Sequence, residues 1–169
     1  MAKVKLTDER IKRAKVYLGN ALDGLLQPKR WVSGAYVLDK KTGKTFYPGY
    51  SSGANSPNVE PQYCAMGALY FEGPKNWGDP ALRAATVLLA RQLPESWLRR
   101  KYDAAVYFAK CDKKKPPAFE DWLIDHTADY DTAHGMIAEF NDGQRDKRPV
   151  VNLFKRTVAE LKEAENEGL

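Results

Sequence analysis

The residues best suited to covalent chemistry surround Cys64, within the segment YCAMGALY at positions 63–70. We expect this segment to form a helix with the cysteine near its start, where unpaired backbone N–H groups and the positive end of the helix dipole lower the pKa of a thiol. A nucleophilic cysteine also needs a base and a group that orients the base, and the chain offers His126, His134, Asn141 and Asp142. Together these residues would form a small Cys-dependent hydrolase or transferase.

The same cysteine also fits a structural role. Cys64, Gly67 and Ala68 fall at positions i, i+3 and i+4 of the expected helix, so they share one face of small side chains. Such a face lets another element approach closely, and free cysteine is among the most buried residue types. We favour this packing role, with Cys64 buried and Gly67 close to another helix or to a hairpin.

A second motif, Phe140-Asn141-Asp142-Gly143, is expected to form a turn between two helices. Asp142 could serve there as a general base or a metal ligand. Asn and Asp side chains in turns commonly bond to nearby backbone groups, so we favour a structural role for both. The predicted structural motif, in which the turn covers the small-residue face, comprises Cys64, Gly67, Ala68, Phe140, Asn141 and Asp142.

A third group of side chains has the types that ligate metals. Its members are Glu120, Asp121, Asp125, His126, Asp129, Asp131 and His134. A divalent ion needs ligands that converge from different elements, and the sequence contains neither an HExxH motif nor an EF-hand loop. We therefore expect a solvated or lysine-matched surface here, with no metal and no cofactor.

The net charge of +5 is unevenly distributed along the chain. Residues 94–115 carry seven Lys and Arg against three acids, whereas residues 116–142 carry seven acids and no Lys or Arg. Basic segments with aromatic residues can bind nucleic acid by neutralising phosphates and stacking on bases, but this alternation also fits internal charge matching. The candidate binding residues are Trp77, Trp97, Arg99, Arg100, Lys113, Lys114 and Lys115.

The spacing of apolar residues and the positions of capping residues predict a mainly α fold, a compact helical bundle with one packed β-hairpin. The hairpin is expected over 31–47, and a Pro/Gly/Ser/Asn-rich connection over 48–62. Helices are expected over 8–26, 62–72, from Asp79-Pro80 to Leu93, 95–110, 118–126, 129–140 and from Asp146 to about Glu165.

The size and composition of the chain point to a single cytoplasmic domain over residues 1–169. No apolar run approaches the roughly 20 residues that a membrane span requires, so we expect no membrane partner. The opening MAKVKLTDERIKRAK lacks the apolar core of a signal peptide, and two cysteines are too few for a disulfide framework.

The order of these motifs resembles a domain family of unknown function found in actinobacteria and their phages. The similarity rests on a Cys-Ala-x-Gly-Ala-Leu segment, a Phe/Trp-Asn-Asp turn and a following helix, which correspond to Cys64–Leu69, Phe140–Asp142 and the helix with Val151 and Phe154. The segment 94–135, which holds both histidines, resembles an enlargement that simpler members lack. The resemblance implies a phage or actinobacterial protein and brings no known reaction.

We therefore expect a non-catalytic binding module rather than an enzyme. Its expected partner is a protein of host or phage, and its expected role is to act on a host protein or to regulate phage development. Two alternatives stay open: an enzyme that uses Cys64, and a nucleic-acid-binding protein that uses its basic segments and exposed aromatic residues.

Overall fold

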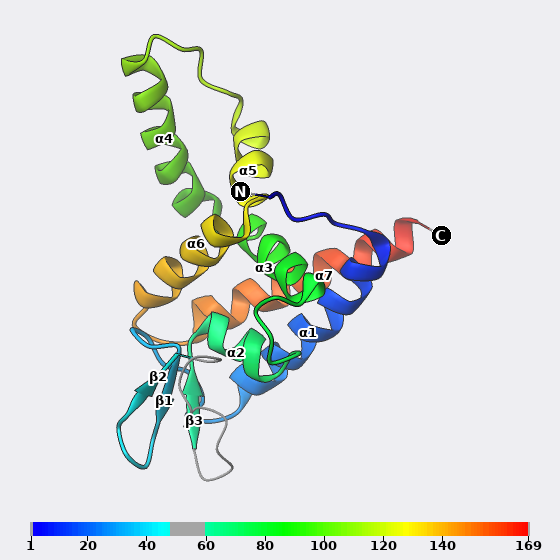
Figure 1. Ribbon diagram of the computed structural model, residues 1–169, viewed down its shortest axis with the longest axis vertical. Coiled ribbons are helices and arrows are strands. Elements are labelled where there is room, and N and C mark those ends of the chain that lie inside the picture. Colours follow the sequence, from blue (N-terminus) through cyan, green and yellow to red (C-terminus); the bar gives the residue numbers. More distant parts are fainter. Residues whose placement is uncertain (1, 48–59, 169) are drawn as a thin grey trace.

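The computed structural model describes residues 2–47 and 60–168 and confirms the predicted fold class, mainly α with a small antiparallel sheet (Figure 1). No helix in these two ranges is long and apolar enough to cross a membrane. The elements are α1 (Asp8–Leu26), β1 (Val37–Asp39), β2 (Thr45–Phe46), β3 (Pro61–Tyr63), α2 (Ala65–Phe71), α3 (Pro80–Arg91), α4 (Glu95–Cys111), α5 (Phe119–Thr127), α6 (Tyr130–Asp142) and α7 (Arg148–Glu167).

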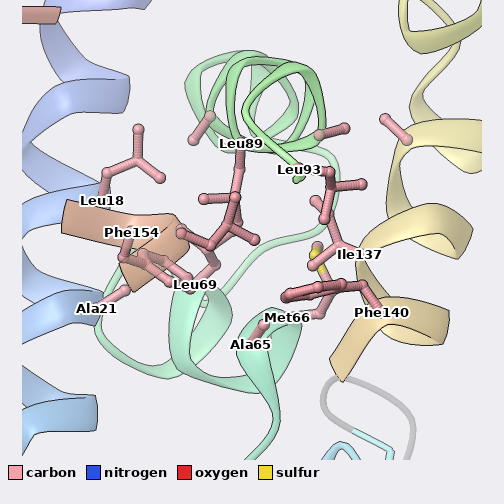
Figure 2. Packing of buried hydrophobic residues seen from close by; sticks show 14 of the residues in the cluster. Leu18, Ala21, Ala65, Met66, Leu69, Leu89, Leu93, Ile137, Phe140 and Phe154 are labelled. Atoms are coloured by element: carbon pink, nitrogen blue, oxygen red, sulfur yellow. The ribbon is translucent and has the colours of Figure 1, made fainter. Parts of the chain in front are cut away.

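Helix α1 has the predicted bounds and packs against α2, α3 and α7. Thr7 begins the helix, because its side chain accepts a hydrogen bond from a backbone N–H of the first turn. Leu18 and Ala21 on its buried side are fully enclosed. Figure 2 shows both beside Phe154 of α7, with Leu69 of α2 next to them. The core therefore forms where these helices meet.

The C-terminal end of α1 is held by Lys147, which precedes α7. Its Nζ donates to the carbonyl oxygens of Leu25, Leu26 and Gln27 at 3.2, 3.4 and 3.3 Å. The last carbonyls of a helix lack intrahelical partners and favour a cation. The last helix, expected from Asp146, begins at Arg148 with Lys147 at the N-cap position, and the Asp146 carboxylate accepts the Arg148 N–H.

The sheet has the strand order β2-β1-β3, with both pairs antiparallel. The predicted hairpin is confirmed in β1 and β2, whose turn contains Gly43 at φ +69°, a conformation that glycine adopts without strain. Most of the connection predicted over 48–62 lies outside the described residues.

Strand β3 corrects the prediction that a helix spans 62–72, since α2 begins only at Ala65. Tyr63 donates its N–H to the Arg30 carbonyl at 2.7 Å and accepts the Val32 N–H at 3.1 Å, while β3 also pairs with β1. Residues 61–63 thus lie between two extended segments that satisfy their backbone groups outside a helix.

Helices α4 and α5 form an arm that projects from the body in Figure 1. Helix α3 ends at Arg91, two residues before the predicted Leu93, and α4 starts directly after Pro94. Helix α4 buries only Leu98 and packs mainly against α5. We call residues 95–127 the arm. That residues 94–135 are an enlargement relative to other family members stays a prediction.

The contact of α2 with the sheet generates the first test. A Cβ added at Gly67 would lie 2.1 Å from the Tyr36 carbonyl oxygen and 2.9 Å from the Cβ of Tyr63. We expect Gly67→Ala to lower the free energy of unfolding by about 1–3 kcal/mol, because backbone must move to admit the methyl group. The control is Gly135→Ala on α6, where an added Cβ meets nothing within 4 Å.

The control should be neutral or stabilising by up to about 1 kcal/mol, since Ala is the better helix former. Urea unfolding followed by circular dichroism gives both values. A Gly67→Ala protein as stable as the parent would contradict the close contact.

Candidate functional site

Cys64 lies at the N-cap position of α2 and is buried, with 3% of its surface exposed. Its Sγ accepts a hydrogen bond from the Gly67 N–H at 3.4 Å. Burial nevertheless dominates and raises the pKa of the Cys64 thiol to about 11. At pH 7 a thiol of that pKa is deprotonated in roughly one molecule in ten thousand. The stabilisation expected from the helix start is therefore outweighed by the loss of water.

The space beside Cys64 is small. A cavity of about 70 Å³ is lined by Gly34, Ala35, Tyr36, Cys64, Ala138 and Asp142. Typical small-molecule sites occupy about 300–1,000 Å³. Among the residues that the structure describes, this cavity beside Cys64 can hold a few waters but not a substrate of ordinary size.

Asn141 connects three separate segments at this place. It is fully buried, and its Oδ1 accepts the Ala65 N–H at 3.0 Å and the Trp31 Nε1–H at 2.9 Å. Its Nδ2 donates to the Val32 carbonyl at 3.2 Å and to Asp142 Oδ1, also at 3.2 Å. The expected bonds from Asn141 to backbone near Cys64 are thus present, and they join α6 to α2 and to the segment before β1.

The prediction that residues 140–143 form a turn is wrong, because α6 continues through Asp142. Asp142 accepts the Gly34 N–H at 2.8 Å. Asn and Asp usually weaken helices because their side chains compete for local backbone groups. Here both side chains bond to distant segments, so the last turn of α6 keeps its own hydrogen bonds.

The two histidines are not paired with Cys64. His134 on α6 is held at both ring nitrogens, with Nε2 2.8 Å from the Tyr36 hydroxyl and Nδ1 3.2 Å from the Tyr130 hydroxyl. Burial lowers the pKa of His134, which favours its neutral form. His126 on α5 instead stacks on Trp122, with ring centroids 4.9 Å apart. The structure thus brings Asp142 near Cys64, whereas the ring nitrogens of His134 are bonded to the hydroxyls of Tyr36 and Tyr130.

The acidic segment is partly matched by lysines. Asp125 pairs with Lys3, and Glu139 pairs with Lys101 at 2.6 Å. Asp129 begins α6 by accepting the Thr132 N–H at 2.9 Å. Within the part of the chain that the structure describes, no group of three or more His, Cys, Asp or Glu side chains is arranged to hold a metal ion.

Several of the predicted binding residues have structural contacts. The Trp77 ring lies 4.7 Å from that of Tyr70 and 5.3 Å from that of His134. The Trp97 ring meets Phe140 edge-on at 6.2 Å. Arg99 pairs with Glu95 and lies over the Phe119 ring, and Lys114 is 4.0 Å from Asp112. Trp77 and Trp97 thus pack against other aromatic rings, whereas Arg99 and Lys114 have acidic neighbours on the arm or its loop.

The remaining predicted residues, Arg100, Lys113 and Lys115, are exposed on α4 and on the loop that follows. The structure adds Tyr107 and Phe108, each 65% exposed, which the sequence reasoning did not assign to a site. We call Arg100, Ala104, Tyr107, Phe108 and Cys111 the outer face of α4. The signal was available, because Tyr107 follows the buried Leu98 by nine positions, which is half a turn away on a helix.

Comparison with known protein families gives a match over most of the chain. The model of a family described as "Family of unknown function (DUF6197)" matches residues 14–160. The chain belongs to this family. The predicted resemblance to a domain family of unknown function is therefore confirmed, whereas an origin in actinobacteria or their phages stays a prediction. No curated protein and no solved structure matches the chain.

Two substitutions compare the structural roles of Asn141 and Cys64. Asn141→Leu leaves the Ala65 and Trp31 donors and the Val32 carbonyl without their partner, and we expect it to cost about 1–3 kcal/mol or more of unfolding free energy. Cys64→Ala removes one buried sulfur and should cost at most about 1 kcal/mol. Chemical unfolding of both variants gives the ranking, and the reverse order would contradict the central role of Asn141.

The raised pKa of Cys64 predicts slow alkylation. Cys111 is exposed and serves as the internal reference. Because folding raises the pKa of Cys64 to about 11, its thiolate fraction and hence its modification by iodoacetamide should increase about tenfold per pH unit between pH 7 and 10. Peptide mass spectrometry follows both sites. Modification of Cys64 in the native protein at pH 7 as fast as in the unfolded chain would contradict the raised pKa and support a role for Cys64 as a nucleophile.

Proposed function

We propose that the chain is a non-catalytic binding module that docks on an acidic protein through the arm. The observation that carries this proposal is the pair Tyr107 and Phe108, adjacent aromatic side chains that are each 65% exposed on a helix that buries only Leu98. Large exposed aromatic residues are common anchors of protein interfaces.

The charge around the two rings selects the kind of partner. Arg100 belongs to the outer face of α4, and three further exposed cations lie at the end of α4 and in the loop that follows: Lys110, Lys113 and Lys115. Within residues 2–47 and 60–168 none of the four has a carboxylate partner at ion-pair distance. An acidic surface would neutralise these charges and speed the encounter.

The shape of the arm suits insertion into a groove. Arg100, Ala104, Tyr107 and Cys111 follow one another at i, i+4, i+7 and i+11, the spacing by which a helix presents a continuous line of contacts. Phe108 lies beside this line. A protein of host or phage, the partner expected from the sequence, would fit such a surface if its groove is acidic.

Nucleic acid is the second candidate partner. Exposed aromatic rings next to cations are also the elements by which proteins hold single strands. An enzyme that uses Cys64 has less support, because the thiol is buried and has a raised pKa, and because His134 is bonded to tyrosines.

The test begins with a photo-crosslinking amino acid in place of Tyr107, with the same group in place of the exposed Ala159 on α7 as the control. The partner captured from Tyr107 alone is then purified, and its affinity is measured by calorimetry. We expect the double variant Tyr107→Ala/Phe108→Ala to bind at least about thirty-fold more weakly, the loss of one interface hot spot. Val16→Ala, which shortens an exposed apolar residue on α1, should bind normally.

Equal binding by the double variant would contradict docking through the arm. A labelled single-stranded oligonucleotide distinguishes the second candidate. Nucleic acid would be the favoured partner if the oligonucleotide binds in a way that depends on Tyr107 and weakens steeply with salt, while no protein is captured.

A further inference from the structure

A groove on the body, separate from the arm, is surrounded by positive charge. It has a volume of about 350 Å³ and lies where the N-terminal segment passes between the start of α1 and the Gly78–Pro80 turn. Four basic side chains contribute to its lining: Lys3, Lys5, Arg10 and Arg83. Of the residues that the structure describes, no Asp or Glu lines it. We call it the basic groove.

The walls of the basic groove are fixed by hydrogen bonds. The Val4 N–H donates to the Ala128 carbonyl at 2.8 Å, and Lys3 forms a β-bridge with Asp129. These contacts attach the N-terminal segment to the junction of α5 and α6, and Figure 1 shows the segment crossing from α1 to that junction. The groove is therefore preformed rather than made by loose chain.

The two arginines are oriented but keep donors free for a ligand. One Nη of Arg10 donates to the Lys5 carbonyl at 3.1 Å. The Nε of Arg83 donates to the Trp77 carbonyl at 3.2 Å, and its guanidinium lies 4.9 Å from the centre of the Tyr130 ring. Neither contact neutralises charge or uses all of the five N–H groups of a guanidinium.

The nearby acids already have partners. Asp79 accepts the N–H groups of Ala81 and Leu82 and pairs with Arg13 at 3.1 Å, and Asp125 pairs with Lys3. In the described part of the chain, Lys5, Arg10 and Arg83 have no carboxylate within ion-pair distance. Like charges gathered in one groove repel each other, and a bound anion would remove that repulsion.

We propose that the basic groove binds a small ligand that carries two or three linked phosphates. Arginine donates paired N–H groups that match phosphate oxygens, and three uncompensated cations spread around the groove suit several phosphates better than one. The start of α3 adds no free N–H, because Pro80 has none and Asp79 occupies the next two, so side chains carry the recognition. The volume fits a nucleotide as well as an inorganic chain.

The test is calorimetric titration of the full chain with sodium tripolyphosphate and, separately, with ADP, at 150 mM salt. We expect saturable one-to-one binding. Arg10→Gln and Arg83→Gln should each weaken it at least about tenfold, the loss typical of a charge-assisted hydrogen bond. Arg145→Gln removes an exposed charge outside the groove and should leave the affinity unchanged. Thermal unfolding of each variant shows that it is folded.

The outcomes separate the ligand sources. Tripolyphosphate binding as tight as that of ADP or tighter indicates recognition of the phosphates alone. Tighter binding of ADP indicates that the lining residues Ala2, Val4 and Pro80 receive a nucleoside. If neither tripolyphosphate nor ADP shows saturable binding at concentrations up to 1 mM, the proposal is overturned. An equal loss of affinity in Arg145→Gln would also overturn it, because such a loss indicates non-specific counterion exchange. Much tighter binding of a single-stranded oligonucleotide than of either small anion would overturn it as well.

Discussion

The arrangement of the body depends on one buried amide. Asn141 is fully enclosed, and a buried amide without partners would cost about 1–3 kcal/mol for each group left unpaired. None of the hydrogen bonds of its side chain goes to the backbone of α6. They go to Ala65 at the start of α2, to Trp31 and Val32 before β1, and to the side chain of its neighbour Asp142. These bonds are satisfied only when α6, α2 and the segment leading to the sheet meet in one geometry, so Asn141 specifies the fold as well as stabilising it.

The same geometry determines the chemistry of Cys64. Fixing the start of α2 against α6 and the sheet buries the thiol, and a Cβ added at Gly67 would lie against the Tyr36 carbonyl oxygen. A helix N-terminus favours a thiolate, but desolvation opposes it more strongly. The motif that first suggested a nucleophile therefore serves the junction, and the surfaces left for binding lie away from it.

The sequence predicts features that depend on neighbouring residues well, and it predicts poorly the features that depend on contacts between distant segments. The bounds of α1, the hairpin and the start of α3 at Asp79-Pro80 follow from capping and turn residues, whose effects act within a few positions. Strand β3 was missed because Pro61–Tyr63 is held by Arg30, Val32 and β1, which are distant in sequence. The end of α6 was misjudged for the same reason, since Asn141 and Asp142 bond to segments more than a hundred residues away.

The distribution of charge follows from which acids fold beside which bases. The acidic segment 116–142 lies against Lys3 and Lys101, and other acids in it accept backbone bonds, so part of its charge is compensated within the body. The positive charge that remains is not spread evenly. Two places that hold several such charges are the far end of the arm and the basic groove, and in the groove Arg10 and Arg83 are held by carbonyl groups rather than carboxylates. Carbonyls orient a guanidinium without neutralising it, so the guanidinium groups of Arg10 and Arg83 keep their charge although they are already oriented.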